Sequence, residues 1–251
     1  MKLDLSDIVP KVLGKSQKGQ DSLIEIIFEK ISTTNKYYVE FGGADGVTSC
    51  NTWYFKNMKG WSGLLLDCDF ENPAINLHRR HLTKENVCSI FSEFKVPIDL
   101  DFLCVDIDGM DYWLLKEILS KYTPRVLMVE TNVRFAPYDS KVLKYDADWR
   151  WDAWRPWRAH ADWRRDGRKW YGGSPYAFKK LLNSHGYDPI HIHLDDMLAV
   201  RKDVLEENGY EAPSWESVYS TPNIDLYKDH TGRFNEGIIA QLDTSEWEEV
   251  V

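Results

Sequence analysis

Three absences narrow the class of protein before any motif is considered. The 251-residue chain has four cysteines, none of them in a CxxC pair, so neither a disulfide framework nor a zinc site is indicated. No apolar run approaches the roughly 18 residues of a membrane span, and Met1 opens into polar sequence without a signal-peptide core. We therefore expect a cytoplasmic protein with reduced thiols and no membrane partner.

An excess of positive charge is also missing. The formal net charge is −9, which argues against general nucleic-acid binding because it removes the sequence-independent attraction to phosphates. Residues 206–251 carry eleven acidic residues against two basic ones, so the first 205 residues are neutral overall. We expect residues 1–205 to form one domain. The acidic extension 206–251 either packs on that domain or builds a contact in a homodimer.

Apolar runs separated by crossover-length intervals predict a parallel α/β sheet. The runs are apolar throughout rather than alternating, as expected for strands that helices cover on both faces. Two later runs, 187–193 and 197–201, flank an Asp195-Asp196 turn and predict an antiparallel hairpin. The other strands are expected at 37–41, 63–67, 86–90, 101–106 and 125–130, and helices at 21–31, 51–58, 73–83, 111–121 and 174–185.

A glycine-rich turn follows the first predicted strand. The run VEFGGADG places Glu40, Gly42, Gly43 and Asp45 at the carboxyl edge of the sheet, where open α/β sheets bind ligands. Glycines let the backbone turn sharply and approach a ligand closely, whereas acids in place of bases disfavour a phosphate. A cationic, phosphate-free cofactor therefore fits better than a dinucleotide, with an ordinary tight turn as the structural alternative.

The second predicted strand ends in an acid. Asp67 stands 21 positions after Gly46, the spacing at which an acid holds ribose hydroxyls in nucleotide-type folds. Asp69 is a weaker candidate for the same role. Ser89 follows the third predicted strand and is a candidate contact to an adenine.

Acids also cluster after the fourth and fifth predicted strands. The run CVDIDGMDYW contains Asp106, Asp108 and Asp111, and carboxylates this close require a cation or hydrogen-bond donors. The next strand end supplies Glu130 and Asn132, so Asp106, Glu130 and Asn132 could converge on Mg²⁺. Helix capping by Asp108 or Asp111, and an ion pair of Glu130 with a nearby arginine, are the structural alternatives.

A tryptophan-rich segment and a histidine pair complete the candidates. Residues 146–170 hold six of the eleven tryptophans, whose faces suit stacking on sugar rings. Trp151, Trp154 and the nearby Tyr171 are candidate substrate contacts, and the segment is expected to be either a lid or a self-packed insertion. His191 and His193 share one strand face; a hydrogen-bonded pair is favoured, with His193 as a candidate base.

The motifs VEFGGADGVTSCNTW, GWSGLLLDCD, FLCVDIDGMDYWLLKEIL and YGGSPYAFKKLLNSHGY, followed by LAVRKDVL, resemble the FkbM-type branch of class I S-adenosylmethionine (SAM) methyltransferases over residues 37–205. The resemblance implies a Rossmann-like fold, with a mostly parallel seven-stranded sheet ending in the antiparallel hairpin, and makes residues 1–205 a methyltransferase domain. It implies methyl transfer to a hydroxyl of a sugar, glycan or glycosylated small molecule. The resemblance implies cofactor contacts at Glu40, Gly42, Asp45, Asn51 and Asp67 and a transfer centre that contains Asp106, Asp108 and Asp111. Gly43, Ser89 and Asp106 are further candidate cofactor contacts.

Two functions stay open from the sequence. A methyltransferase would hold an alcohol oxygen in line with the sulfonium methyl, and positioning would supply most of the rate. Asp108, and after it Asp111, is the expected base, with Mg²⁺ as an optional cofactor. The alternative is a catalytically silent glycan- or nucleic-acid-binding module that keeps the fold and uses the tryptophan-rich segment for recognition.

Overall fold

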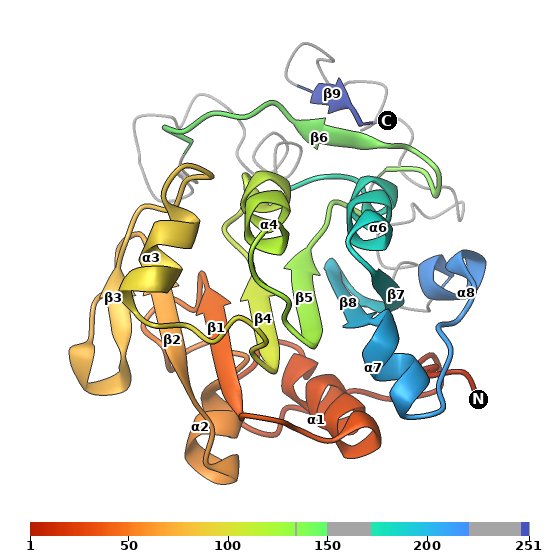
Figure 1. Ribbon diagram of the computed structural model, residues 1–251, viewed down its shortest axis with the longest axis horizontal. Coiled ribbons are helices and arrows are strands. Elements are labelled where there is room, and N and C mark those ends of the chain that lie inside the picture. Colours follow the sequence, from red (N-terminus) through yellow and green to blue (C-terminus); the bar gives the residue numbers. More distant parts are fainter. Residues whose placement is uncertain (134, 150–171, 221–246, 251) are drawn as a thin grey trace.

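The computed structural model describes residues 1–133, 135–149, 172–220 and 247–250. Seven strands form one sheet in the order β3-β2-β1-β4-β5-β8-β7, in which β8 runs antiparallel to both of its neighbours and the other pairs are parallel (Figure 1). The elements are α1 (Gln20–Ile31), β1 (Tyr37–Phe41), α2 (Trp53–Lys59), β2 (Ser62–Asp67), the 3-10 helix η1 (Pro73–Ile75), β3 (Leu77–Arg79), α3 (Val87–Glu93), β4 (Phe102–Val105), α4 (Asp111–Leu119), β5 (Val126–Glu130), β6 (Lys141–Leu143), α6 (Pro175–Ser184), β7 (Tyr187–His193), β8 (Asp196–Arg201), α7 (Lys202–Glu207), α8 (Trp215–Tyr219) and β9 (Trp247–Glu249). The predicted α/β fold, a mostly parallel seven-stranded sheet with an antiparallel hairpin, is confirmed.

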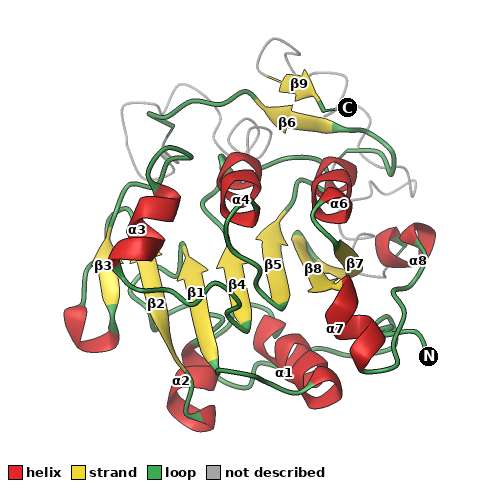
Figure 2. Cartoon of the chain, in the orientation of Figure 1, coloured by secondary structure: helices red, strands yellow, loops and turns green. Residues whose placement is uncertain are grey.

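Helices cover both faces of this sheet (Figure 2). On one face, α3, α4 and α6 pack against side chains such as Val39 and Leu103. On the other face, α1, α2 and α7 pack against Tyr38 and Phe102, the neighbours of those residues in β1 and β4. Because successive strand residues point to opposite faces, both sets of strand positions are apolar, and the sequence shows continuous apolar runs.

The third strand was predicted in the wrong place. Residues 86–90 do not form a strand; Val87–Glu93 is helix α3, and its buried positions include Val87, Ile90 and Phe91, which follow helical spacing. The third strand is β3, inside the segment predicted as the helix 73–83, because Pro73 opens a 3-10 turn that the left-handed Asn76 ends. A short apolar run fits a strand or a buried helix equally well. Here the helical spacing of the buried residues over Val87–Glu93 agrees with the helix.

The described parts of the acidic extension lie against the domain. The Trp215 indole donates to the Pro137 carbonyl at 2.9 Å, and the Tyr219 hydroxyl donates to the Phe135 carbonyl at 2.7 Å. Strand β9 pairs antiparallel with β6, so a piece of the far C-terminus completes a small second sheet. In the described ranges, no helix has both the length and the apolar character needed to cross a membrane.

A buried ion pair lies at the amino ends of the strands, at the edge of the sheet opposite the two cavities described below. Asp101 is fully buried, and its carboxylate accepts hydrogen bonds from the backbone N–H groups of Thr34, Asn35 and Lys36. The Arg125 guanidinium lies 2.9 Å from the same carboxylate and also donates to the carbonyls at the end of α1. This pair therefore ties the α1–β1 loop to β4 and β5.

We predict that Asp101→Ala lowers the free energy of unfolding by about 3–5 kcal/mol, because it leaves a buried guanidinium without its charged partner and three backbone amides without their acceptor. Urea unfolding followed by circular dichroism measures the loss. The matched control is Glu117→Ala, which removes the exposed i,i+4 partner of Lys121 and should change the midpoint little. Equal midpoints for the two variants would contradict the structural role of Asp101.

Candidate functional site

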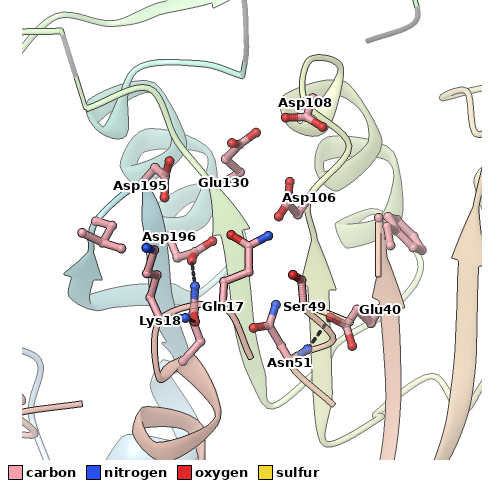
Figure 3. Close-up of a pocket in the computed structure, with 14 residues that line it drawn as sticks. Gln17, Lys18, Glu40, Ser49, Asn51, Asp106, Asp108, Glu130, Asp195 and Asp196 are labelled. Carbon is pink, nitrogen blue, oxygen red and sulfur yellow. Dashed lines mark hydrogen bonds between the residues drawn. The ribbon is translucent and has the colours of Figure 1, made fainter. Parts of the chain in front are cut away.

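Two cavities open at the carboxyl edge of the sheet and share one wall. The first, of about 280 Å³, contains six carboxyl groups, those of Glu40, Asp106, Asp108, Glu130, Asp195 and Asp196 (Figure 3), and is called the acidic cavity below. The second, of about 230 Å³, has Asp67 and Asp69 beside the apolar side chains of Phe70, Leu82, Ile107 and Met110, and is called the mixed cavity. Gly42, Asp106 and Asp108 line both cavities.

Gly42 makes this shared wall possible. Its φ of +67° lies in the left-handed region, and a Cβ at this position would fall 1.9 Å from the Asp106 carbonyl oxygen. Such a separation is far inside van der Waals contact, so any other residue would push the β1 and β4 loops apart. Gly43 is different, since a Cβ there would meet its nearest heavy atom, in the Glu40 side chain, at 3.5 Å. Gly43 does not line either cavity.

Strained backbone collects at the same edge. Ala44, Ser49, Asp108 and Leu194 have φ values of 47°, 62°, 56° and 58°, respectively. Each of them lines at least one of the two cavities. A non-glycine residue in this region costs of order 1–3 kcal/mol and persists only where the surrounding structure holds it. Strain of this kind is typical of functional sites.

Glu40 organises the loop that follows β1. Its carboxylate accepts from the backbone N–H of Asn51 at 2.8 Å and of Thr52 at 3.0 Å, and from the side chains of Thr52 and Cys50. Burial raises the pKa of Glu40, and these donors act against that rise. Glu40 borders the acidic cavity, but its oxygens already have protein partners, so its main visible task is to place Asn51.

Asn51 presents an unused acceptor to the acidic cavity. The residue is 7% exposed, and its Oδ1 has no hydrogen-bond partner among the described residues. Its Nδ2 lies 3.8 Å from the Cys104 sulfur. A buried carbonyl oxygen without a partner is uncommon in proteins and calls for a donor from a ligand or from water.

Asp45 and Asp67 each hold a turn, but only Asp67 reaches a cavity. The Asp45 carboxylate accepts from the backbone N–H groups of Val47 and Thr48, which lowers its pKa, and it lines neither cavity. Asp67 accepts from the N–H of Asp69 at 2.8 Å with one oxygen and borders the mixed cavity. Ser89 is an exposed residue of α3 whose hydroxyl donates to the Asn86 carbonyl; its prediction followed from the misplaced third strand.

Three carboxylates from two neighbouring strand ends come together. One oxygen each of Asp106, Asp108 and Glu130 lies within 4.8 Å of the others. Burial, followed by the charge of Asp108, raises the pKa of Asp106, and burial, followed by the charge of Asp106, raises that of Glu130. Burial raises the pKa of Asp108 to about 6. Carboxylic acids that repel one another in this way favour a bound cation.

Two other predicted site residues, Asp111 and Asn132, are buried and line neither cavity. Asp111 is fully buried, and its carboxylate accepts from the N–H groups of Ile107 and Gly109, both at 2.8 Å. It therefore shapes the loop that presents Asp106 and Asp108, and burial raises its pKa to about 7. Asn132 is buried, and its backbone N–H donates to the Gly173 carbonyl. Neither residue lines either cavity, and the third carboxyl group beside Asp106 and Glu130 is that of Asp108.

The histidine pair lies beneath the N-terminal segment. His193 is 4% exposed, and its Nε2 lies 3.0 Å from the Lys18 carbonyl. His191 is buried, and burial lowers its pKa to about 4. Neither ring lines a cavity, although His193 lies opposite Asp196 in the β7–β8 register. Trp151, Trp154 and Tyr171 lie outside the described residues.

Several cavity residues were not found from the sequence. Gln17, Lys18 and Gln20 line the acidic cavity, and Gln20 donates from Nε2 to Asp196 at 2.8 Å across 176 positions of sequence. Asp195 and Asp196 were noted only as a turn, yet Asp196 lies opposite Glu130 in the β5–β8 register. Asp196 could have been predicted from the sequence, because the turn of a hairpin whose strand pairs antiparallel with β5 lies at the carboxyl edge of the sheet, next to Glu130. No local pattern marks residues 17–20.

The chain is similar to several solved methyltransferase structures. One is a Klebsiella pneumoniae protein assigned as an O-methyltransferase, with 12% identity and a TM-score of 0.41 over 76% of this chain and 83% of that one. Another is an O-methyltransferase from Bacillus cereus in complex with S-adenosylhomocysteine, with 13% identity and a TM-score of 0.40 over 76% and 84%. The O-methyltransferase NcsB1 from neocarzinostatin biosynthesis, solved with SAM and 2-hydroxy-5-methyl naphthoic acid, has 13% identity and a TM-score of 0.35 over 72% and 56%.

No protein-family model matches the chain, and no curated protein matches its sequence. With identities of 12–13% to the three structures, the activity has to be derived from the site itself.

Proposed function

We propose that this protein is a class I SAM-dependent O-methyltransferase. The observation that carries the proposal is that the two cavities adjoin at Gly42, Asp106 and Asp108. The mixed cavity contains Asp67, and the acidic cavity is rich in carboxyl groups. A ligand that extends from one cavity into the other fits best if its half in the mixed cavity is nucleoside-like and its half in the acidic cavity carries no phosphate group. SAM meets both requirements.

The residues of the mixed cavity fit the nucleoside half. Phe70, Leu82, Ile107 and Met110 offer apolar surface for an adenine, and the Asp67 carboxylate suits a ribose diol. The carboxylates of Asp106 and Asp108 suit the positive charge of a sulfonium. When bound, SAM supplies a methyl group on positively charged sulfur.

We assign to Asp108 the role of taking a proton from the acceptor, since Asp106 is a proposed metal ligand. It lines both cavities, and it belongs to the group with Asp106 and Glu130. An acceptor hydroxyl that loses its proton as the methyl group arrives needs a base within hydrogen-bond reach. Asp111 does not compete for this role, because both of its oxygens hold backbone amides.

The acidic cavity favours a hydroxyl-rich acceptor. Among the described residues that line it, only Phe41 and Leu194 have large apolar side chains. Such a wall offers little surface for a flat aromatic molecule but many acceptors for hydroxyl donors. We therefore infer that the acceptor is a sugar, a glycan or a glycosylated small molecule.

A divalent cation fits beside the same acceptor. Asp106 and Glu130 are its proposed ligands, with Asp108 within reach, and hard carboxylate oxygens are the ligands that Mg²⁺ prefers. When bound, Mg²⁺ would lower the pKa of an acceptor hydroxyl. The protein's own contribution is to hold these carboxylates at two neighbouring strand ends.

The central prediction concerns cofactor binding. S-adenosylhomocysteine should bind the purified protein in isothermal titration calorimetry, and Asp67→Ala should weaken binding by about ten- to a hundredfold through loss of charge-assisted hydrogen bonds to the ribose. The control is Asp69→Ala in the same cavity, which should lose much less. A wild-type protein that binds no S-adenosylhomocysteine would remove the proposal and leave the silent binding module as the better account.

A second prediction separates chemistry from binding. Asp108→Asn should lower the rate of methyl transfer by about a hundred- to ten-thousandfold, while the affinity for S-adenosylhomocysteine stays within a few-fold of wild type. Transfer is measured as labelled methyl groups moved from SAM to a panel of sugars. Turnover at the wild-type rate in this variant would exclude Asp108 as the base.

A third prediction concerns the cation. Mn²⁺, used as a paramagnetic substitute for Mg²⁺, should bind the protein in an EPR titration, and Glu130→Gln should weaken this binding at least tenfold. The control is Glu93→Gln, an exposed partner of Arg80 on α3, which should leave Mn²⁺ affinity unchanged. If chelator-treated enzyme keeps full activity and Mn²⁺ does not bind, methyl transfer runs without a metal.

A further inference from the structure

The segment 144–149 follows β6 and forms one wall of the mixed cavity. The residues of this segment that line the cavity are Tyr145, Asp146, Ala147 and Trp149. The Ala147 carbonyl lies 2.7 Å from His81 Nε2, and the Asp146 backbone N–H donates to the Met110 sulfur at 3.4 Å. The segment is therefore held against the loops that follow β3 and β4.

The Trp149 side chain lies on the loop that carries Asp108. Its Nε1 donates to the Asp108 carbonyl at 3.1 Å. A Cβ on Gly109 would fall 1.9 Å from the same nitrogen, and the next-nearest atoms, at 2.5 and 2.7 Å, also belong to the indole. Gly109 does not have the positive φ of Gly42, so a glycine is required here for the space that the ring occupies rather than for an unusual backbone conformation.

This contact holds a strained residue. Asp108 has a φ of 56°, and a non-glycine residue keeps this conformation only where its surroundings hold it. The peptide group after Asp108 is held at both of its polar atoms, because the Gly109 N–H donates to Asp111 at 2.8 Å and the Asp108 carbonyl accepts from Trp149. The orientation of this peptide group defines ψ of Asp108. The two hydrogen bonds therefore fix the direction in which the Asp108 side chain leaves the backbone.

We propose that Trp149 is a positioning residue, which acts through the carbonyl of Asp108 to hold the carboxyl group of that residue in place for proton transfer. The inference rests on the proposed function, in which Asp108 is the base. The indole also lines the mixed cavity, so the segment that borders the nucleoside half of the ligand also sets the base. Trp149 is the first tryptophan of the tryptophan-rich segment, and this role is distinct from the substrate contacts expected of Trp151 and Trp154.

The first test removes the indole N–H. Trp149→Phe keeps an aromatic ring but no longer donates to the Asp108 carbonyl. We expect kcat for methyl transfer from SAM to the panel of sugars to fall roughly ten- to a hundredfold, because a displaced base costs rate. The KM for the acceptor and the affinity for S-adenosylhomocysteine should stay within about threefold of wild type. Hydrogen–deuterium exchange at the Gly109 amide should become faster, and this measurement needs no acceptor.

The matched control is Trp113→Phe. Trp113 Nε1 donates to the Leu143 carbonyl at 2.8 Å, so this variant loses the same kind of hydrogen bond. Trp113 lines neither cavity, and the control should keep the wild-type kcat and the wild-type exchange at Gly109.

A second test changes the other side of the contact. The methyl group of Gly109→Ala should displace the indole and lower kcat, at saturating SAM, about as far as Trp149→Ala does. In the Trp149→Ala background the same methyl group meets none of the three indole atoms. The double variant should therefore be no slower than Trp149→Ala alone. Retained binding of S-adenosylhomocysteine shows that each variant has folded.

Three results overturn the positioning role and leave the proposed methyltransferase function standing. They are a wild-type kcat in Trp149→Phe, unchanged exchange at Gly109 in that variant, and a loss confined to the affinity for S-adenosylhomocysteine. Additive losses in the double variant do the same, because they show that Gly109 and Trp149 act separately. If wild type binds no S-adenosylhomocysteine, the proposed function fails and the role of Trp149 fails with it.

Discussion

The site depends on how closely two loops approach each other. Strands β1 and β4 pair in parallel with Glu40 opposite Cys104, so two residues later Gly42 meets Asp106. A Cβ on Gly42 would lie 1.9 Å from the Asp106 carbonyl oxygen, and the chain can close here only because that atom is missing. The contact gives the two cavities a common wall. It therefore sets the cavity that contains Asp67 directly beside the cavity that contains the carboxyl groups of β4 and β5.

The acids at this edge divide into two groups by their partners. Glu40, Asp45 and Asp111 accept from backbone N–H groups and so fix the loops. Asp106, Asp108 and Glu130 instead face one another, and the Glu130 Oε2 has no partner among the described residues. Buried carboxyls with donors stabilise a fold, whereas buried carboxyls that repel each other make a site for a cation. The same residue type therefore builds the frame and supplies the chemistry.

Much of the fold was predictable because burial leaves a clear pattern in the sequence. The strands β1, β2, β4 and β5 and the hairpin appear as apolar runs, and the meeting of Asp106 with Glu130 follows from adjacent parallel strands. The run 86–90 misled because a short apolar stretch does not distinguish a strand from the buried face of a helix. The wall at residues 17–20 was out of reach, since the bond from Gln20 to Asp196 spans 176 positions. The four donors to the Glu40 carboxylate could not be predicted from the sequence of β1 either, because they lie in the loop 50–52.

The strained backbone at this edge persists only because the surrounding structure holds it. Four non-glycine residues in the left-handed region, Ala44, Ser49, Asp108 and Leu194, lie at the two cavities, and each costs of order 1–3 kcal/mol. Mutual repulsion among the carboxylates adds to this cost. The Asp101–Arg125 pair and the two helical layers lie away from the strand tips and hold the sheet that presents them. A positively charged ligand relieves the repulsion among Asp106, Asp108 and Glu130, so this edge of the sheet favours a cation over an anionic molecule.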